Sequence, residues 1–583
     1  MLKALFNSIF KPLVELLRTA SFNINYLFFS NQPNLTLRIR ILFVILSFLV
    51  AFLVVAFRII KLSTYNSQYS HYSRNTHFKH RKEIVDRNNN ILAVNLFAPS
   101  IIARTKKISS PEGLVKQLQY VFTDINGDKL LNALKNNKNF VVVKRHLTPT
   151  QHKQVYDLGI PGLDFEEDYK RVYTYGNLLS HVLGYVSTDM RGLAGIENYY
   201  HNYLSNNDSQ LKEEELNKPL VLSIDIRIQD IVSKELDKTI KDFSAIGGVG
   251  IIADPNNGEI LALVSKPDFD PHYPAKAVER QLFNKASLGV YELGSVMHAL
   301  TIAIGLDTET ITLNNTYDLT DFKIDNFRIK DYKNFVGYYT VPEIFMYSSN
   351  IGIVQIGLDI GQFNLKKYFK LLALDKTLKI ELPEKANSLY HANTSWNNIT
   401  TATISYGYGI SISPLHFVQA MIPIVNGGNL YPITLIKRTP NDNLIAQKIF
   451  SSKTSKELNS LLRLAVKHGT SKNSDVVGYL VGGKVGTAKK IKDRKYDKNS
   501  IRSSFIGIYP SIAPKFIIYL MLDEPKSNNS TYELTNAAEH AITSAAAKII
   551  SKIGTLYGIQ PYHTEMTSVQ NLKNNNNSQH GIK

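Results

Sequence analysis

Apolar positions cluster in a small number of long stretches, and one of them lies near the start of the chain. Residues 41–57 are uncharged and mostly apolar, and two isoleucines continue the run beyond Arg58. This length is near the lower limit for crossing the hydrocarbon core of a bilayer, so the pattern predicts one transmembrane helix over residues 41–60. A cleaved signal peptide is the alternative, but the run lies far from the N-terminus and no small-residue cleavage site follows it.

Later apolar runs and turn signals predict one antiparallel sheet. The strands Val249–Ala253 and Glu259–Ser265 flank Asp254-Pro-Asn-Asn-Gly258, which is a hairpin signal. Further strands are predicted at a glycine-rich edge near Lys484 and at the apolar runs Phe505–Tyr509 and Phe516–Leu522. The alanine-rich segment Ala537–Ile553 predicts a helix that covers this sheet. A strand followed by a helix start, over residues 221–229, predicts where this domain begins.

The segment Tyr291–His298 carries candidate chemistry. Gly294 permits a tight turn, and the apolar run that follows predicts a buried helix with Ser295 in its first turn. A hydroxyl there lies at the positive end of the helix dipole, which favours a developing alkoxide. His298 lies three residues later on the same helix face and offers a base. Taken alone, a serine in this setting is far more often an N-cap than a nucleophile.

Two further polar stretches strengthen that interpretation. Tyr347-Ser348-Ser349-Asn350 lies between two apolar segments and predicts a polar loop between buried helices. The segment Val481–Ala488 predicts a strand edge whose glycines let a ligand approach the backbone closely. Ser295, Ser348-x-Asn350 and Lys484-x-Gly486-Thr487 together resemble, in order and approximate spacing, the three active-site motifs of penicillin-binding proteins and serine β-lactamases, S-x-x-K, S-x-N and K-[TS]-G.

A second resemblance lies upstream. The segment Arg81–Ala93 is similar to the signature R-G-x-I-x-D-R-N-G-x-x-L-A that opens the extracytoplasmic part of class B penicillin-binding proteins, with Lys82 and Asn89 in place of its glycines. Asparagine tolerates a positive φ better than most residues, so the turn at Asn89 is expected to persist. In the same region, Arg87, Arg171 and Glu197 are expected to form a partly buried ion-pair network.

The resemblance implies a membrane-anchored α/β (α+β) protein, in which a mixed pedestal domain precedes a transpeptidase fold whose antiparallel sheet is covered by helices. The expected segments are a basic cytoplasmic segment at 1–40, the transmembrane helix at 41–60, a pedestal domain of the dimerisation type at 63–216, the transpeptidase domain at 217–560 and a disordered Asn-rich tail at 561–583.

Charge and cysteine content narrow the partners. The formal net charge of +18 suits a nucleic acid, an anionic membrane surface or an acidic polymer. The chain has no basic helix with interleaved aromatic residues and no glycine-rich loop of the nucleotide-binding types, so no nucleic-acid partner is expected. The absence of cysteine excludes disulfides and cysteine-ligated metals. The reaction that the resemblance implies needs neither a metal nor an organic cofactor.

The membrane segment, the pedestal signature and the sequence Tyr-Glu-Leu-Gly-Ser look most like the division-specific, FtsI-type class B enzymes, with an elongation-specific relative as the nearer alternative. The resemblance implies a peptidoglycan D,D-transpeptidase that cross-links stem peptides through an acyl-serine intermediate during septal wall synthesis and binds β-lactams. It implies a single pass through the inner membrane, with the N-terminus in the cytoplasm and the bulk of the chain in the periplasm. The implied partners are D-Ala-D-Ala stem peptides, an FtsW-type membrane glycosyltransferase and other divisome proteins.

The resemblance also implies roles for the site residues. Ser295 would attack the penultimate D-Ala carbonyl, and backbone N–H groups of Ser295 and of the strand just after Thr487 would hold the oxyanion. Ser348 would relay a proton to the leaving amine, and Asn350 would anchor the amide backbone of the substrate. Lys484 and Thr487, with Gly486 between them, would receive the substrate carboxylate.

The chain departs from the family pattern at two positions. His298 stands where the family has the lysine of S-x-x-K, and Val485 replaces a hydroxyl residue in K-[TS]-G. A neutral imidazole is able to act as a base near pH 7, but its reach is shorter than that of lysine. Losing a well-placed general base costs on the order of 10²- to 10⁴-fold in rate. Two functions therefore stay open: an active transpeptidase, and an acylation-impaired homologue acting as a non-enzymatic divisome scaffold. The pedestal signature disfavours a soluble β-lactamase or a β-lactam sensor.

Overall fold

The computed structural model describes residues 45–58, 81–136, 139–206, 218–389, 396–439, 442, 444–526 and 534–562. The chain divides into two compact units, Met1–Lys79 and His80–Lys583. In the first unit, residues 45–58 form a helix with exposed side chains, apart from the half-buried Ala56. No helix in the described part of the chain combines the length and the apolar character needed to cross a membrane. The predictions for residues 1–40, for both ends of the 41–60 span and for residues 563–583 concern positions outside the described residues.

The N-terminal part of the second unit holds two small sheets with short helices, as the expected mixed pedestal would. Its strands are β1 (Ile84–Val85), β2 (Ile91–Phe97), β3 (Ser100–Ala103), β4 (Val141–Lys144), β5 (Leu163–Glu166) and β6 (Tyr169–Tyr173). Its helices are α4 (Pro111–Val121), α5 (Gly127–Asn136), α6 (Pro149–Asp157), α7 (Ser180–Leu183), α8 (Gly195–Tyr199) and α9 (His201–Leu204). The sheet in the order β4-β3-β5 and helices α4 to α6 share a small apolar core of their own.

The other sheet links this region to the chain that follows it. Its strands lie in the order β6-β2-β1-β7, and β7 (Leu220–Val221) pairs in parallel with β1, with Ile84 opposite Leu220. The sequence placed the strand at Val221 at the opening of the second domain; the strand pairs with β1, and the carbonyl of Val221 also accepts a hydrogen bond from the N–H of Lys437 at 3.1 Å. The turn at Asn89 is confirmed, because Asn89 has a φ of 65°. Asp86 accepts hydrogen bonds from the backbone N–H groups of Asn88 and Asn90, which closes this turn.

A buried ion-pair network crosses this region, and its membership differs from the expectation. Glu197 is fully buried and accepts hydrogen bonds from Arg81 and from Arg171, whose Nε lies 2.7 Å away. Arg171 also donates to Asn95 Oδ1 at 3.0 Å. Arg87, which was expected in this network, pairs instead with Glu259, with its Nη1 3.1 Å from Glu259 Oε2. Arg81 therefore takes the position in the network that the sequence had given to Arg87.

A five-stranded antiparallel sheet organises the rest of the unit. Its strands are β8 (Gly247–Ala253), β9 (Ile260–Lys266), β16 (Gly482–Lys492), β17 (Lys495–Tyr509) and β18 (Phe516–Asp523), in the order β16-β17-β18-β8-β9. The hairpin predicted at Asp254–Gly258 is confirmed as the β8–β9 connection, and the runs at 505–509 and 516–522 lie in β17 and β18. The β16 strand forms an edge of the sheet, as predicted for the segment around Lys484.

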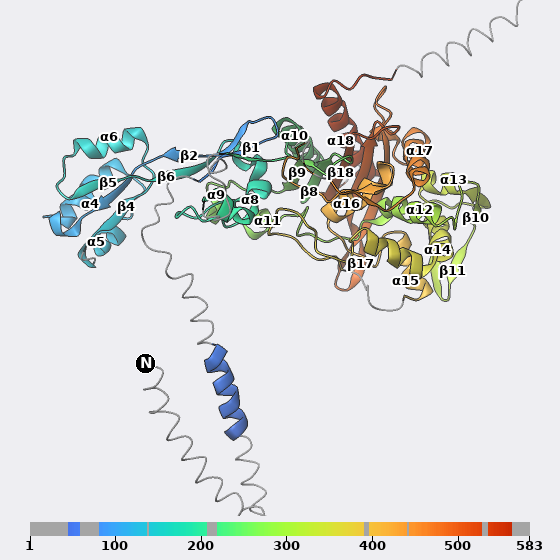
Figure 1. Ribbon diagram of the computed structural model, residues 1–583, viewed down its shortest axis with the longest axis horizontal. Coiled ribbons are helices and arrows are strands. Elements are labelled where there is room, and N and C mark those ends of the chain that lie inside the picture. Colours follow the sequence, from blue (N-terminus) through green and yellow to red (C-terminus); the bar gives the residue numbers. More distant parts are fainter. Residues whose placement is uncertain are drawn as a thin grey trace, which may run out of the picture. The chain divides into compact units, whose positions relative to one another are not determined.

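Side-chain alternation divides the sheet residues between two cores. Phe505, Ile518 and Leu520 face one core, together with residues of α10 (Ile226–Asp242) and α18 (Leu534–Leu556). The helix predicted at 537–553 is thus confirmed as α18, and both helices lie along the sheet in Figure 1. Because side chains alternate across a strand, the neighbours of these residues point into the opposite core.

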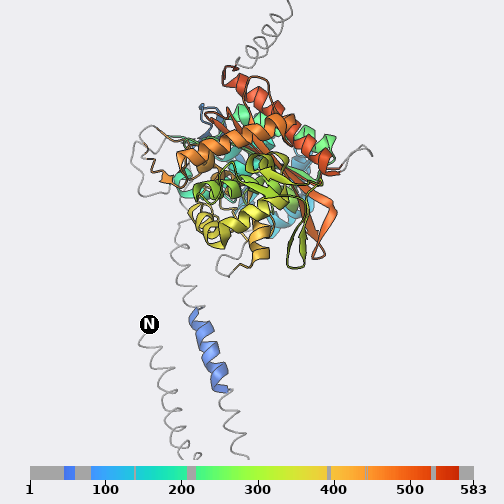
Figure 2. The same ribbon diagram turned by 90° about the vertical axis from the view of Figure 1, so that its right-hand side faces the viewer.

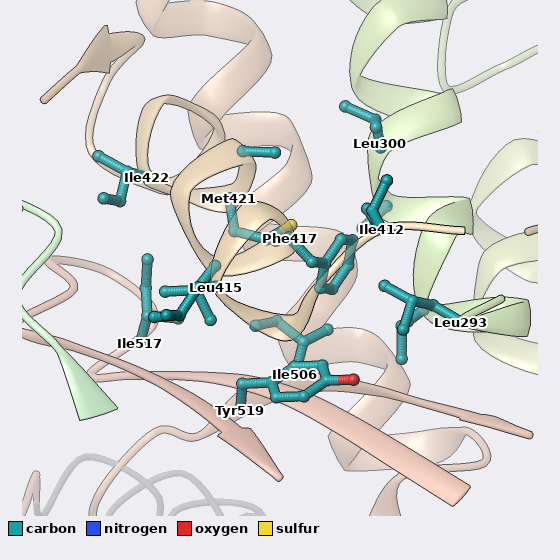
Figure 3. Packing of buried hydrophobic residues seen from close by; sticks show 14 of the residues in the cluster. Leu293, Leu300, Ile412, Leu415, Phe417, Met421, Ile422, Ile506, Ile517 and Tyr519 are labelled. Carbon is teal, nitrogen blue, oxygen red and sulfur yellow. The ribbon is translucent and has the colours of Figure 1, made fainter. Parts of the chain in front are cut away.

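The opposite core anchors the segment that carries Ser295. Ile506, Ile517 and Tyr519 of the sheet lie beneath Leu415 and Phe417 of α16 (Pro414–Val425), and Figure 3 shows Leu293 and Leu300 beside them. The other helices of this layer are α12 (His298–Asp307), α13 (Val341–Tyr347), α14 (Asn350–Leu371), α15 (Asn398–Ser405) and α17 (Ser452–His468), and Figure 2 views the unit from the side of α13 and α14. The short helix α11 (Glu279–Leu282) buries no residue in this core. The described residues also form three two-stranded sheets: β10 (Thr316–Asp318) with β13 (Tyr338–Thr340), β11 (Phe322–Ile324) with β12 (Phe327–Ile329), and β14 (Asn429–Leu430) with β15 (Gln447–Lys448).

Candidate active site

Ser295 lies in a tight turn that is held by backbone contacts. The 3₁₀ turn η6 (Gly294–Met297) leads directly into α12, and Ser295 is partly exposed while the apolar residues around it are buried. Gly294 has a φ of 61° and donates its N–H to the carbonyl of Gly407 at 3.2 Å. A Cβ on Gly294 would lie 2.5 Å from the carbonyl oxygen of Thr487. Only glycine fits there, so the turn is pressed against strand β16.

Ser348 and Asn350 occupy the junction between α13 and α14, where the sequence predicted a polar loop between buried helices. Ser348 caps α13 in the left-handed conformation, with φ 62° and ψ 41°. A non-glycine residue rarely adopts this conformation without support from its surroundings, and such residues cluster at functional sites. Asn350 begins α14, and its side-chain Nδ2 donates to the carbonyl of Lys330 at 3.3 Å.

A carboxylate that sequence reasoning missed holds this junction. Asp331 accepts a hydrogen bond from Ser349 Oγ at 2.6 Å and further bonds from the backbone N–H groups of Asn350 and Ile351. A carboxylate at a helix N-terminus satisfies free N–H groups and the helix dipole together. Asp331 lies 18 residues before Ser349, so no local pattern indicated the contact.

Lys484 lies on β16 beneath this junction and is fully buried. Its Nζ donates to Ser348 Oγ at 2.7 Å and to the carbonyl of Val485 at 3.0 Å. Burial lowers the pKa of Lys484 to about 8, although the negative charge of Glu539 acts in the opposite direction. The hydrogen bond from Lys484 to Ser348 joins the segment Val481–Ala488 to the segment Tyr347–Asn350.

Gly486 joins the third segment to the first. A Cβ on Gly486 would lie 3.1 Å from the backbone nitrogen of Ser295 and 2.6 Å from that of Val296. The missing side chain therefore lets β16 run directly against the serine turn. The structure thus brings Ser295, Ser348, Lys484 and Gly486 into one site, as the sequence predicted they would lie.

The outer edge of β16 presents alternate N–H groups. The N–H of Val485 donates to Ser471 Oγ at 2.9 Å, and the N–H of Lys489 donates to the hydroxyl of Tyr408 at 3.1 Å, so both point away from β17. Because N–H direction alternates along a strand, the N–H of Thr487 also points away from β17. The second N–H donor to the oxyanion was expected in the strand just after Thr487, whereas this alternation favours the N–H of Thr487 itself.

His298 lies at the start of α12 and is fully buried. Neither ring nitrogen has a hydrogen-bond partner of acceptable geometry among the described residues. Burial holds the pKa of His298 well below its usual value, the charge of Lys484 lowers it further, and the nearby Asn350 side chain opposes them. The imidazole is therefore neutral at pH 7, and no hydrogen bond within the described chain connects it to Ser295.

Two other carboxyl groups that sequence reasoning missed adjoin the site. Glu292 accepts hydrogen bonds from the backbone N–H of Gly409 at 2.7 Å and from the hydroxyl of Tyr496 at 3.0 Å, which braces the segment before Ser295. Glu539 of α18 accepts a hydrogen bond from Thr487 Oγ1 at 3.3 Å. Burial raises the pKa of Glu539, and the neighbouring Lys484 and Thr487 oppose that rise. The sequence placed Glu539 only on a covering helix.

Comparison with known proteins identifies the group to which this arrangement belongs. Residues 248–550 match the model of the penicillin-binding protein transpeptidase domain, and residues 79–218 match that of the penicillin-binding protein dimerisation domain. The chain belongs to the penicillin-binding protein family. The predicted domain limits, 63–216 and 217–560, stay predictions.

Two named relatives are similar to this chain along most of their length. The chain is 32% identical over 507 residues to a probable peptidoglycan D,D-transpeptidase FtsI of Caulobacter vibrioides, covering 85% of this chain and 84% of that protein. It is 30% identical over 539 residues to the stage V sporulation protein D of Bacillus subtilis, covering 85% and 83%. The chain is therefore a class B penicillin-binding protein homologous to the FtsI-type D,D-transpeptidases.

Two solved structures resemble the fold of this chain. A peptidoglycan glycosyltransferase from Burkholderia ambifaria is 29% identical, with a TM-score of 0.51, over 58% of this chain and 98% of that one. A peptidoglycan synthetase from Bifidobacterium adolescentis superposes with a TM-score of 0.65 at 19% identity, over 83% of this chain and 96% of that one. The second likeness bears on the fold alone.

Proposed function

We propose that this penicillin-binding protein is a serine-type peptidoglycan D,D-transpeptidase of cell-wall synthesis and division. The observation that carries the proposal is the 2.7 Å hydrogen bond from Lys484 Nζ to Ser348 Oγ, which joins two motifs beside the turn of Ser295. The homologous enzymes named peptidoglycan D,D-transpeptidase support the reaction class. The substrates would be D-Ala-D-Ala stem peptides, and β-lactams would acylate the same serine.

The reaction would begin when Ser295 Oγ attacks the carbonyl carbon of the penultimate D-Ala. Two backbone N–H groups, those of Ser295 and Thr487, would stabilise the resulting oxyanion. Ser348 Oγ accepts a hydrogen bond from Lys484, so Ser348 can pass its own proton to the leaving amine while Lys484 supplies the proton that replaces it. The C–N bond then breaks and terminal D-Ala leaves. An amine of a second stem peptide attacks the acyl-serine ester, which forms the cross-link and releases Ser295.

Asn350 and Lys484 would hold the donor peptide. Asn350 Nδ2 already donates to the carbonyl of Lys330, so its side-chain oxygen is the group left to accept an amide N–H of the substrate. Lys484 supplies positive potential for the terminal carboxylate, and Thr487 supplies a hydroxyl. Val485 has no hydroxyl to offer the carboxylate, and its side chain is buried among apolar residues that include part of α18.

The proton of Ser295 needs an acceptor, and the candidate in the S-x-x-K position is His298. The neutral imidazole has an open nitrogen, but its lowered pKa makes it a weak base. We therefore expect acylation to be slower, on the order of 10²- to 10⁴-fold, than with a well-placed base. The isolation of His298 also favours a second candidate function, in which the chain is acylation-impaired and serves as a divisome scaffold.

The membrane anchor and the partners are part of the same proposal. An apolar helix at residues 45–58, with its side chains exposed, supports an anchor over residues 41–60. The proposed topology places the N-terminus in the cytoplasm and the bulk of the chain in the periplasm. An FtsW-type glycosyltransferase and other divisome proteins would contact the anchor and the pedestal region. Unchanged association after both regions are scrambled would remove the proposed contact.

Covalent labelling by a fluorescent penicillin tests the function. The full-length protein is compared with Ser295→Ala and His298→Lys variants in detergent, and the labelled band is quantified over time. Labelling of the native protein that vanishes in Ser295→Ala establishes the nucleophile and makes His298 a serviceable base. An unlabelled native protein with recovery in His298→Lys supports the scaffold function instead. Absence of labelling in every variant contradicts the acyl-serine proposal.

A further inference from the structure

A carboxyl group of the protein already occupies the donors that the substrate carboxylate would use. Glu539 Oε1 accepts the hydrogen bond of Thr487 Oγ1 at 3.3 Å. Its negative charge also acts on Lys484 through space: it raises the pKa of the lysine, against the larger effect of burial, and the lysine opposes the rise that burial causes in the pKa of Glu539. Under the proposed function, Lys484 and Thr487 are the two groups that receive the terminal carboxylate of the acyl donor. Glu539 therefore competes with that carboxylate for the same partners.

The position of Glu539 makes this competition local. Side chains alternate along β16, so Val485 and Thr487 point to the same face of the strand, toward α18. Val485 is apolar and buried, which leaves Thr487 as the hydroxyl of this pair. Glu539 and Thr487 are both partly exposed, whereas Lys484 is fully buried. A ligand that approaches Thr487 from solvent consequently meets Glu539.

We propose that Glu539 is a specificity-determining residue that disfavours anionic acyl donors unless its carboxyl group is protonated or displaced. This inference rests on the proposed function, since it concerns the same site. Two carboxylates that share one lysine and one hydroxyl repel each other, and one of them takes up a proton or leaves. A protonated Glu539 carries no charge and releases Lys484 for the ligand, so binding of an anionic donor is coupled to proton uptake.

The groups that face Glu539 come from several elements. Lys484 and Thr487 belong to β16. Tyr332 lies on the segment between β12 and β13; burial raises its pKa, and the nearby charge of Glu539 adds to that rise. Asp331 lies beside Tyr332 and is engaged with the start of α14. His298 of α12 faces Lys484 and is neutral. Burial raises the pKa of Glu539, so lowering the pH protonates it and favours an anionic ligand.

The first test compares acylation by two probes that differ in one charge. Second-order acylation rate constants are measured for the full-length protein with a fluorescent penicillin, which has a carboxylate, and with its neutral methyl ester. The variants are Glu539→Gln, which keeps the side-chain shape, Glu539→Asp, and Glu384→Gln as the matched control. Glu384 is a partly buried carboxyl outside the site, bonded to the N–H of Gly195, and its loss changes the net charge equally.

We expect Glu539→Gln to raise the ratio of penicillin to ester acylation about tenfold, and Glu384→Gln to leave it unchanged. In the native protein this ratio should rise as the pH is lowered and Glu539 takes up a proton, and Glu539→Gln should remove that rise. An equal change for both probes, or a lower ratio in Glu539→Gln, would overturn the proposal.

A second measurement separates this inference from the function on which it rests. Equilibrium binding of the fluorescent penicillin is followed by anisotropy in Ser295→Ala, where no acyl-enzyme forms, and in the Ser295→Ala, Glu539→Gln double variant. About tenfold tighter binding in the double variant supports the role of Glu539 even if native labelling fails. Failure to observe this gain overturns the inference and leaves the labelling result at Ser295 unaffected.

Discussion

The pedestal region and the active site bury charged groups in different ways. In the pedestal, Glu197 is fully buried between Arg81 and Arg171, whose side chains are 2% and 1% exposed. In the active site, Lys484 is equally buried, but its hydrogen bonds go to a hydroxyl and a carbonyl, and its carboxyl neighbour Glu539 is partly exposed. His298 beside it has no partner among the described residues.

This contrast separates a structural role from a chemical one. In the pedestal, Arg81 and Arg171 both donate hydrogen bonds to Glu197, so each buried charge is in direct contact with an opposite one. A lysine without a direct carboxylate contact has its pKa moved toward neutrality, and a hydroxyl that it bonds gains a free proton to transfer. In the active site, the hydroxyl of Ser348 therefore keeps a proton that it can donate, whereas in the pedestal Glu197 is bonded by two arginines.

Removing the shared carboxylate of the pedestal should have the largest effect. Glu197→Ala leaves Arg81 and Arg171 buried without their partner, and breaking a buried pair in this way costs about 3–5 kcal/mol of unfolding free energy. Urea unfolding followed by circular dichroism measures the change, with Glu166→Ala at an exposed position as the control. A loss below about 1 kcal/mol would mean that the network is not what holds this region together.

Removing the charge of the active site should instead affect chemistry. Lys484→Met keeps the length of the side chain but removes both hydrogen bonds and the positive potential, and we expect labelling by penicillin to fall by about a hundredfold. The unfolding free energy should stay the same or rise, because a buried charge without a direct counter-ion is lost. A protein that loses labelling only because it unfolds would contradict the contrast with Glu197.

Replacing His298 with an apolar side chain tests whether its isolation is real. His298→Leu removes two buried nitrogens that have no partners among the described residues, and we expect the protein to gain about 1 kcal/mol of unfolding free energy. Thermal unfolding of the two proteins, scanned side by side, provides the measurement. A clear destabilisation would indicate that the imidazole makes a hydrogen bond that stabilises the fold.

Raising the pH should change the unfolding free energy and the acylation rate in opposite directions through the titration of Lys484. Its folded pKa of about 8 lies below the ordinary value of 10.5, so the unfolded state binds more protons between these two values. The contribution of Lys484 to the unfolding free energy therefore rises with pH in this window, whereas acylation falls as the lysine loses its charge. Rate and stability profiles of the native protein and Lys484→Met should differ in these opposite directions. Parallel profiles in the two proteins would assign the titration to another group.

Local patterns in the sequence were enough for much of this fold. The β8–β9 hairpin follows from Asp254–Gly258 between two apolar strands, and α18 follows from its run of alanines. The positions of Ser295, Ser348 and Lys484 were found because their motif order resembles that of a known family. Each of these signals lies within a few residues or in a known spacing.

Contacts between distant residues escaped prediction. The parallel pairing of Leu220 with Ile84, the place of Arg81 beside Glu197 and the cap that Asp331 forms on α14 each join segments far apart in the chain. Nothing within a short window distinguishes such residues from solvent-exposed ones. Glu539 was missed for the same reason, because a charged residue on a covering helix is ordinarily a surface position.

The free edge of β16 has a consequence for how long a peptide it can recognise. The N–H groups of Val485 and Lys489 are already taken by Ser471 and Tyr408, and Thr487 lies between them. Between these two residues, an extended peptide that adds to this edge meets only the N–H of Thr487, which fixes the register of the peptide at this point. The backbone of β16 would therefore fix the position of one peptide bond of the donor. The distance from that bond to the end of the donor chain would follow from backbone geometry.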